Sequence, residues 1–225
     1  MGRAIRSRFE ALGDTVASAD LKDADVIADV TSFAECERMV AEVVAAHGRL
    51  DVLVCAAGVW VEGPTADTTE EQWNRVIDVN LKGTFFACRF AIPKLVASRG
   101  CIVNISSDYG LVGGPGAAVY NASKFGVNGI TRSLALELAP LGVRVNSVCP
   151  ADVDTPMLAG QARDFGGGDP EGYLAALKAT LPQKERARFI TPDEIAALVV
   201  FLCSEEAAPI TGACIPIEWG VTAGY

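Results

Sequence analysis

Residues 50–57 read "LDVLVCAA", an apolar run that only Asp51 interrupts. The run shows no alternation of polar and apolar residues. This pattern is typical of a strand that is covered on both faces of a parallel sheet. We therefore expect residues 50–57 to form a doubly buried strand, with helices packed above and below it.

Segments on both sides of this run alternate between strand-like and helix-like patterns, and the order predicts an α/β protein with a doubly wound parallel sheet. Its 225 residues fit one domain, residues 1–225. Further strands are expected at 15–19, 26–30, 101–106, 143–150 and 214–218, and helices at 32–48, 69–97, 117–138 and 191–201.

Residues 156–190 break this alternation. They combine "GGGDPEG", a helical patch "YLAALKATL" and the charged "QKERAR". A long irregular insertion after a strand often covers a binding site. We expect a substrate lid here, with a plain mobile surface loop as the alternative.

Composition excludes several classes of protein. The net charge is −9 without a basic run, which argues against a nucleic-acid partner or an anionic membrane surface. The chain also lacks an apolar stretch of the ~18 residues that a membrane span needs. Seven scattered cysteines without a C-x-x-C pair argue against disulfides and a metal site, and favour a reducing cytoplasm. His47 is the single histidine, and a Ser-His-Asp hydrolase would have to use it, which argues against that class of enzyme.

Ligands of doubly wound sheets bind beyond the carboxyl ends of the strands. Small and polar residues fall at these ends, which points to an organic cofactor: Asp20, Asp29, Ala57, Gly58, Ser106, Ser107, Pro150 and Ala151.

The segment "YNASK" places Tyr120 and Lys124 four residues apart on one helix face. Ser107 lies 13 positions before Tyr120, at a predicted strand end, and Asn80 lies in the preceding long helix. A tyrosine has a reference pKa of about 10 and must ionise more readily to exchange protons near neutral pH. We expect the Lys124 ammonium to lower the pKa of Tyr120 enough for general acid/base catalysis.

Together these segments resemble the short-chain dehydrogenase/reductase family of compact, single-domain oxidoreductases. The resemblance covers nearly the whole chain, in the family's order and spacing. It rests on "ADVTS" (28–32), "LDVLVCAAG" (50–58), "VNLKGTFF" (79–86), "IVNISS" (102–107), "YNASK" (120–124), "LAPLGVRVNSVCP" (138–150), "VDTPM" (153–157) and "ITG" (210–212).

The resemblance implies a Rossmann-like fold and four catalytic residues. Tyr120 would be the general acid/base, and Lys124 would assist it and hold the nicotinamide ribose. Ser107 would hydrogen-bond the reacting oxygen, and Asn80 would hold a water that links Lys124 to solvent.

A nicotinamide cofactor is also implied. Asp20 would accept hydrogen bonds from the adenosine ribose and repel a 2′-phosphate, which favours NAD over NADP, although nearby Lys22 weakens that preference. The other cofactor contacts implied are Asp29, Val30, Ala56, Ala57, Gly58, Tyr120, Lys124, Pro150, Val153 and Thr155.

Several positions depart from the family pattern. The usual Asn-Asn-Ala-Gly is Cys55-Ala56-Ala57-Gly58, the usual Pro-Gly is Pro150-Ala151, and the usual Asp-Gly-Gly is Glu218-Trp219-Gly220. Family chains begin with a strand and Thr-Gly-x-x-x-Gly-Ile-Gly, whose last two residues align with Met1-Gly2. We therefore expect the first strand and most of the glycine-rich loop to be absent. Residues 15–19 would then pair directly with 50–57, or a slot two strand spacings wide would have to be filled in another way.

The sequence thus predicts an NAD(H)-dependent oxidoreductase that transfers hydride between nicotinamide and a secondary alcohol or ketone. The helices at 69–97 and 117–138 resemble those that build family tetramers, so a homo-oligomer, a tetramer or a dimer, is expected. One alternative is a non-catalytic family member that acts as a binding or scaffold subunit. A sugar-nucleotide epimerase or dehydratase is the other, although 225 residues leave little room for its larger substrate domain.

Overall fold

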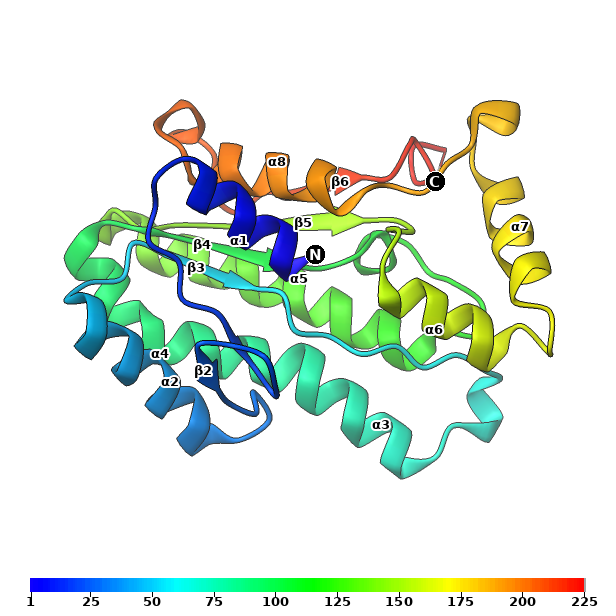
Figure 1. Cartoon of the computed structure of the whole chain (residues 1–225), viewed down its shortest axis with the longest axis horizontal. Coiled ribbons are helices and arrows are strands. Elements are labelled where there is room, and N and C mark those ends of the chain that lie inside the picture. The colour runs from blue at the N-terminus through cyan, green and yellow to red at the C-terminus, as the bar shows by residue number, and fades with distance from the viewer. Residues whose placement is uncertain (225) are drawn as a thin grey trace.

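A four-stranded parallel sheet forms the centre of the computed structural model, which describes residues 1–224. Its order is β3-β4-β5-β6, with all three neighbouring pairs parallel and with helices on both faces (Figure 1). The single-domain, Rossmann-like α/β fold is therefore confirmed. The strands are β3 (Val52–Cys55), β4 (Cys101–Ile105), β5 (Arg144–Pro150) and β6 (Cys214–Ile217).

A second, separate sheet contains only β1 (Ala19–Asp20) and β2 (Val26–Ile27), which pair in parallel. Both strands are shorter than the predicted 15–19 and 26–30. The sequence left two outcomes for residues 15–19. The first of them, direct pairing with residues 50–57, is wrong, because β1 and β3 belong to different sheets. A strand with a single short partner has few ladder hydrogen bonds to extend it, which explains the loss of length.

Helices α2, α4 and α5 cover one face of the main sheet, and α1 and α8 cover the other (Figure 1). The helices are α1 (Gly2–Ala11), α2 (Phe33–His47), α3 (Glu70–Val76), α4 (Gly83–Ser98), α5 (Ala118–Leu138), α6 (Pro156–Phe165), α7 (Pro170–Thr180) and α8 (Pro192–Cys203).

Two apolar cores follow from this layering. Successive side chains of a strand point to opposite faces of the sheet. Ile102 of β4 therefore packs into the core under α2, α4 and α5. Val103 and Ile105 pack instead with Ile5 of α1 and the buried side chains of α8.

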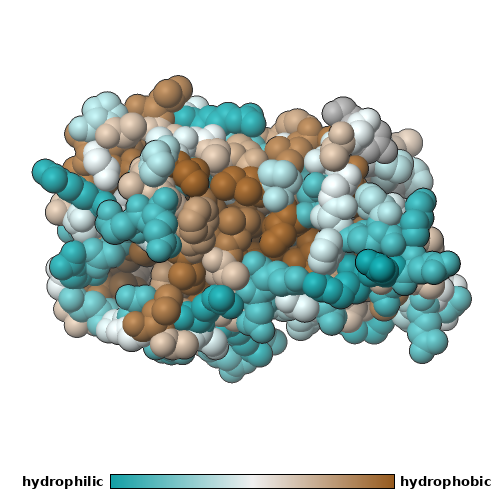
Figure 2. Space-filling model, turned by 90° about the horizontal axis from the view of Figure 1, so that it is seen from above, coloured by the Kyte–Doolittle hydropathy of each residue, from teal (hydrophilic) through white to brown (hydrophobic). Residues whose placement is uncertain are grey.

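The prediction that residues 50–57 form a doubly buried strand is wrong in its burial, although the strand is present. All four residues of β3 are only half-buried. β3 is an edge strand of the four-stranded sheet, so one side of its backbone lacks a neighbouring strand. Met1, Ala4 and Val54 stay partly exposed where they pack against the second core. Separately, Figure 2 shows apolar surface near the centre of the face seen from above.

The long helix expected at 69–97 is present in three continuous parts. A capping box of Thr69 and Gln72 starts α3, as their sequence spacing predicts. One turn of π-helix, Ile77–Lys82, then precedes α4. π-Turns of this kind frequently occur at functional sites, and this one contains Asn80.

The segment 156–190 is mostly helical rather than irregular, because it forms α6 and α7. It leaves and rejoins the domain at one point, where Val153 and Ile190 form a parallel bridge. The Asp154 N–H donates to the Ile190 carbonyl at 2.8 Å, and the Ile190 N–H donates to the Asp152 carbonyl at 3.0 Å.

Candidate active site

Lys124 is fixed at the carboxyl end of β4. Its side chain is buried, and its Nζ donates to the Ile105 carbonyl at 3.0 Å. The Ser106 hydroxyl donates to the Lys124 carbonyl at 3.1 Å and ties α5 to the same strand end. Burial lowers the pKa of Lys124 to about 8, because the ammonium loses most of its hydration.

Tyr120 lies one turn before Lys124, and the Lys124 Nζ is 5.6 Å from the centre of its ring. Burial raises the pKa of Tyr120, and the charges of Asp108 and Asp152 raise it further, whereas a hydrogen bond with Ser107 lowers it. The expectation that Lys124 lowers this pKa is wrong for the chain by itself. Loss of hydration is the largest cause of the rise, and the Lys124 ammonium is directed to the Ile105 carbonyl.

Ser107 is buried directly after β4, close to Tyr120 as predicted. Its hydroxyl donates to Oδ1 of Asp108 at 2.7 Å. The Tyr109 N–H donates to Ser107 Oγ at 3.1 Å and to the same Asp108 oxygen at 2.8 Å. The short helix Asp108–Gly110, which Ser107 caps, therefore holds the serine through these bonds.

Asn80 is fully buried beside this group. Its Oδ1 accepts from the Val59 N–H at 2.8 Å, while its Nδ2 donates to the Val59 carbonyl at 3.0 Å and to Ser123 Oγ at 3.1 Å. The side chain therefore fastens the loop after β3 to α5. These bonds use both Nδ2 hydrogens and one of the two lone pairs of Oδ1, and the water expected at Asn80 stays a prediction.

The predicted adenosine-side residues lie at the ends of β1 and β2. Asp20 is exposed, and its Oδ1 accepts from the Leu21 N–H at 2.7 Å. Asp29 Oδ1 accepts from the Thr31 N–H at 2.8 Å. Val30 packs so closely on α4 that a Cβ on Gly83 would lie 2.8 Å from its Cγ2.

The other predicted cofactor residues follow β3 and β5. Ala56, Ala57 and Gly58 continue from β3, and Pro150 ends β5. Val153 joins the bridge to Ile190, and Thr155 caps α6.

These residues fit a dinucleotide along the carboxyl edge of the sheets. A Cβ on Gly58 would lie 3.4 Å from Asn80 Oδ1 and 3.7 Å from Lys124 Nζ, so glycine leaves the backbone open above the lysine. The N-terminal end of α1 lies on the side to which the strands point (Figure 1). Its first turn has no acidic residue and no side-chain cap, so its N–H groups suit an anionic group such as a pyrophosphate.

Sequence reasoning missed an aromatic group over the site. The ring centre of Trp60 lies 4.4 Å from that of Tyr120 and 5.8 Å from that of Tyr109. Glu62 accepts from Trp60 Nε1 at 3.2 Å and from the Tyr173 hydroxyl of α7 at 2.8 Å. The position of Trp60 just after a predicted strand end was the available signal.

Asp152 was also missed, although it follows Pro150-Ala151 at a strand end. Burial raises the pKa of Asp152 to about 6, and the charges of Asp108 and Glu62 contribute to the rise. Several carboxyl groups therefore influence one another around Tyr120.

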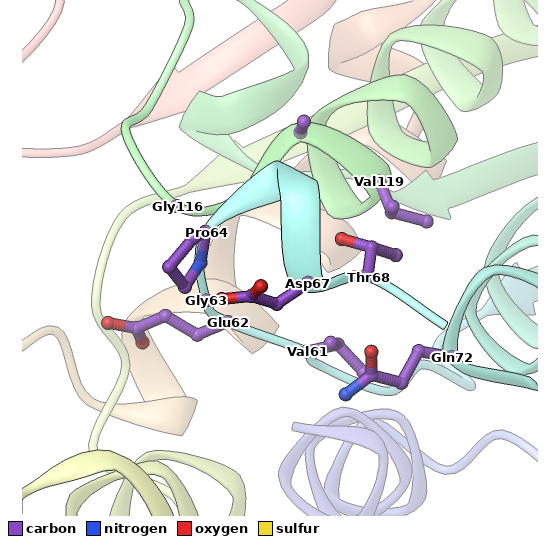
Figure 3. A pocket seen from close by; sticks show the side chains of 10 residues that line it. Val61, Glu62, Gly63, Pro64, Asp67, Thr68, Gln72, Gly116 and Val119 are labelled. Carbon is purple, nitrogen blue, oxygen red and sulfur yellow. The ribbon is translucent and has the colours of Figure 1, made fainter. Parts of the chain in front are cut away.

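A small cavity of about 160 Å³ lies beside the site, between the loop after β3 and the start of α5. Figure 3 shows its lining, which includes Glu62, Thr68 and Val119. The Gly63 N–H donates to the Gly116 carbonyl at 2.9 Å and joins its two walls. Val119 connects this cavity to Tyr120 along the chain.

Within residues 1–224, no set of three or more His, Cys, Asp or Glu side chains is arranged to hold a metal ion. In the same residues, no helix combines the length and the apolar character needed to cross a membrane.

A parallel sheet with Tyr120, Lys124 and Ser107 at one strand end defines a Rossmann-like oxidoreductase. A family model described as "Enoyl-(Acyl carrier protein) reductase" matches residues 1–222. The chain belongs to the short-chain dehydrogenase/reductase family.

Two similar curated proteins are dehydrogenases of alcohols. The chain is 38% identical over 223 residues to trans-4-hydroxycyclohexanecarboxylate dehydrogenase of Sinomonas cyclohexanicum, covering 99% of this chain and 80% of that one. It is 39% identical over 238 residues to meso-2,3-butanediol dehydrogenase of Serratia marcescens, covering 99% and 90%. The ligand-free structure of Thermoplasma acidophilum aldohexose dehydrogenase superposes with a TM-score of 0.92 at 36% identity, covering 99% and 89%.

Proposed function

We propose that this protein transfers hydride between NAD(H) and a secondary alcohol or ketone, with Tyr120 as the general acid/base. The observation that carries the proposal is the meeting of Tyr120, Lys124 and Ser107 at the carboxyl end of β4. The relatives that are dehydrogenases of alcohols support the reaction class.

Each side chain has a defined task in this reaction. Ser107 orients the reacting oxygen, and Tyr120 takes the alcohol proton during oxidation or returns it during reduction. Lys124 holds the ribose hydroxyls, and its burial against the Ile105 carbonyl keeps its Nζ in place. Asn80 keeps the loop after β3 closed against α5 through Val59. A bound oxidised nicotinamide would supply the hydride acceptor and a positive charge that favours the tyrosinate.

Asp20 supports a preference for NAD. Its carboxylate is exposed at the end of β1, where it would accept from a ribose diol and repel a 2′-phosphate. The ratio of kcat/KM for NAD to that for NADP tests this preference, and a tenfold preference for NADP would reject it.

We further propose a homo-oligomer and a lid. Four large apolar side chains are exposed on α3, α4 and α5: Trp73, Phe85, Phe125 and Leu136. A second copy of the chain would cover them. The mass of the protein in solution, measured by light scattering, tests this assembly. Residues 156–190 would close over the substrate through the bond from Tyr173 to Glu62. The free cysteines support a reducing, cytoplasmic location.

The central test is Tyr120→Phe. General acid/base help contributes roughly 10²–10⁴ in rate, so the variant should lose nearly all turnover. Its affinity for NAD, measured by calorimetric titration, should stay within a few-fold of the wild type. A variant that keeps more than a tenth of the wild-type kcat would reject Tyr120 as acid/base, whereas a wild type that binds NAD but converts no alcohol would favour the scaffold alternative.

A further inference from the structure

The hydroxyl of Ser107 has one proton, and the structure directs it away from the reaction. Ser107 Oγ donates to Asp108 Oδ1 at 2.7 Å and accepts from the Tyr109 N–H at 3.1 Å. Both Ser107 and Asp108 are more than nine-tenths buried. In this arrangement the proton lies on Asp108, so Ser107 can donate to Tyr120 or to the reacting oxygen only when the proton turns away from Asp108.

A carboxylate acceptor holds a donor about twice as strongly as a neutral one. The strength of the Ser107–Asp108 bond therefore depends on the charge of Asp108. An ionised Asp108 retains the serine proton. A neutral Asp108 holds it weakly, and the proton is then free to turn to a substrate oxygen that gains negative charge.

Several charged groups face Asp108. Burial raises the pKa of Asp108, and the charge of Glu218 contributes to the rise, whereas the bonds from Ser107 and Tyr109 lower it. Asp152 interacts with Asp108 from the segment after β5, and Glu62, in the loop after β3, interacts in turn with Asp152. The nearby cation, Lys124, donates to the Ile105 carbonyl.

We propose that Asp108 is a positioning residue whose charge decides whether Ser107 donates to the reacting oxygen. The site works best with a neutral Asp108 and loses a hydrogen-bond donor when Asp108 ionises. This inference rests on the proposed function, because it assigns to Ser107 the contact with the reacting oxygen.

The experiment compares Asp108→Asn with Asp152→Asn across pH 5–9. The charges of both aspartates raise the pKa of Tyr120, but only Asp108 is hydrogen-bonded to Ser107. Asp152→Asn therefore controls for the general effect of removing a negative charge. Loss of a donor to a developing oxyanion costs about 10²–10³ in kcat. For each variant, kcat is divided by the wild-type kcat at the same pH. Between pH 5 and pH 9 this ratio should rise about tenfold or more further for Asp108→Asn than for Asp152→Asn.

A double variant shows whether the effect passes through Ser107. In a Ser107→Ala background, adding Asp108→Asn should change the pH dependence of kcat no more than adding Asp152→Asn does. An Asp108→Asn ratio that does not vary with pH, or that varies equally in both backgrounds, overturns the inference.

A titration without turnover separates this inference from the proposed function. The Asp108 carboxyl carbon, followed by NMR, should titrate at a higher pH in Ser107→Ala, because the Ser107 hydroxyl stabilises the carboxylate. An unchanged pKa would overturn the inference even if catalysis by Tyr120 is established. If Tyr120→Phe stays active while the Asp108 pKa rises as expected, the proposed function fails and the bond between Ser107 and Asp108 stands.

Discussion

Lys124 makes folding dependent on pH. The pKa of its ammonium is about 8 in the folded protein against an ordinary value of 10.5. Below pH 8 both states are protonated, so the folded state bears the whole cost of burial, about 3 kcal/mol. Between about pH 8 and 10.5 the unfolded chain binds more protons, so this contribution to stability rises with pH.

We predict that Lys124→Met stabilises the protein at pH 7. Removing the buried charge contributes about 3 kcal/mol, and the Ile105 carbonyl loses a hydrogen bond worth about 1 kcal/mol. The net gain is about 2 kcal/mol in the free energy of unfolding, measured in urea. This gain should fall to zero at about pH 10 and become a loss of about 1 kcal/mol well above pH 10.5. There the wild-type lysine is neutral in both states, so only the missing hydrogen bond to the Ile105 carbonyl still counts. A less stable Lys124→Met at pH 7 would contradict the burial cost.

At the scale of elements, the site depends on how closely the short helix Asp108–Gly110 packs on α5. A Cβ on Gly110 would lie 2.6 Å from Ser106 Oγ, 2.8 Å from Asn128 Nδ2 and 2.9 Å from the Lys124 carbonyl oxygen. The last of these atoms is backbone and yields little. Glycine is required here by the close approach of the two helices.

Gly110→Ala is therefore expected to destabilise the protein by roughly 1–3 kcal/mol, the usual cost of overpacking. It should also lower kcat, because the displaced helix carries Asp108 and borders Ser107. Gly113→Ala is the matched control, since a Cβ there meets no atom within 4 Å. Thermal unfolding and kcat of the two variants check the prediction, which fails if both variants behave alike.

At the scale of the whole molecule, the strands are divided between two sheets. β3 bonds to β4 on one side, while β1 and β2 form their own sheet. Consequently β4 and β5 each have two neighbouring strands, and β3 has one. The residues of β4 are buried, whereas those of β3 are half-buried.

This difference predicts uneven protection of the backbone from hydrogen exchange. Amides with few buried apolar neighbours open at lower free energy than those of a core strand. Residues 52–55 should therefore exchange faster than residues 102–105 and 145–148 under native conditions, as measured by mass spectrometry of peptides. Equal protection of the three strands would show that the free edge of β3 is covered in solution.

The sequence alone determined the order of elements and most of the site. Its apolar runs predicted β3 to β6 within a few residues, because these strands alternate with amphipathic helices and pair locally in a parallel sheet. The spacing of Tyr120 and Lys124 predicted a shared helix face, since residues four apart lie on one side of a helix. The placement of Ser107 followed from its position at the end of a strand.

Only the tertiary structure decided the pKa of Tyr120 and the burial of β3. Whether Tyr120 gains or loses acidity depends on hydration and on carboxyl groups brought close by other segments, and no local pattern encodes these distances. The half-burial of β3 depends on which strands are neighbours, so an apolar run could not reveal it. Likewise, the bond from Tyr173 to Glu62 joins residues 111 positions apart. Such contacts form when the chain folds, because they depend on the packing of whole elements.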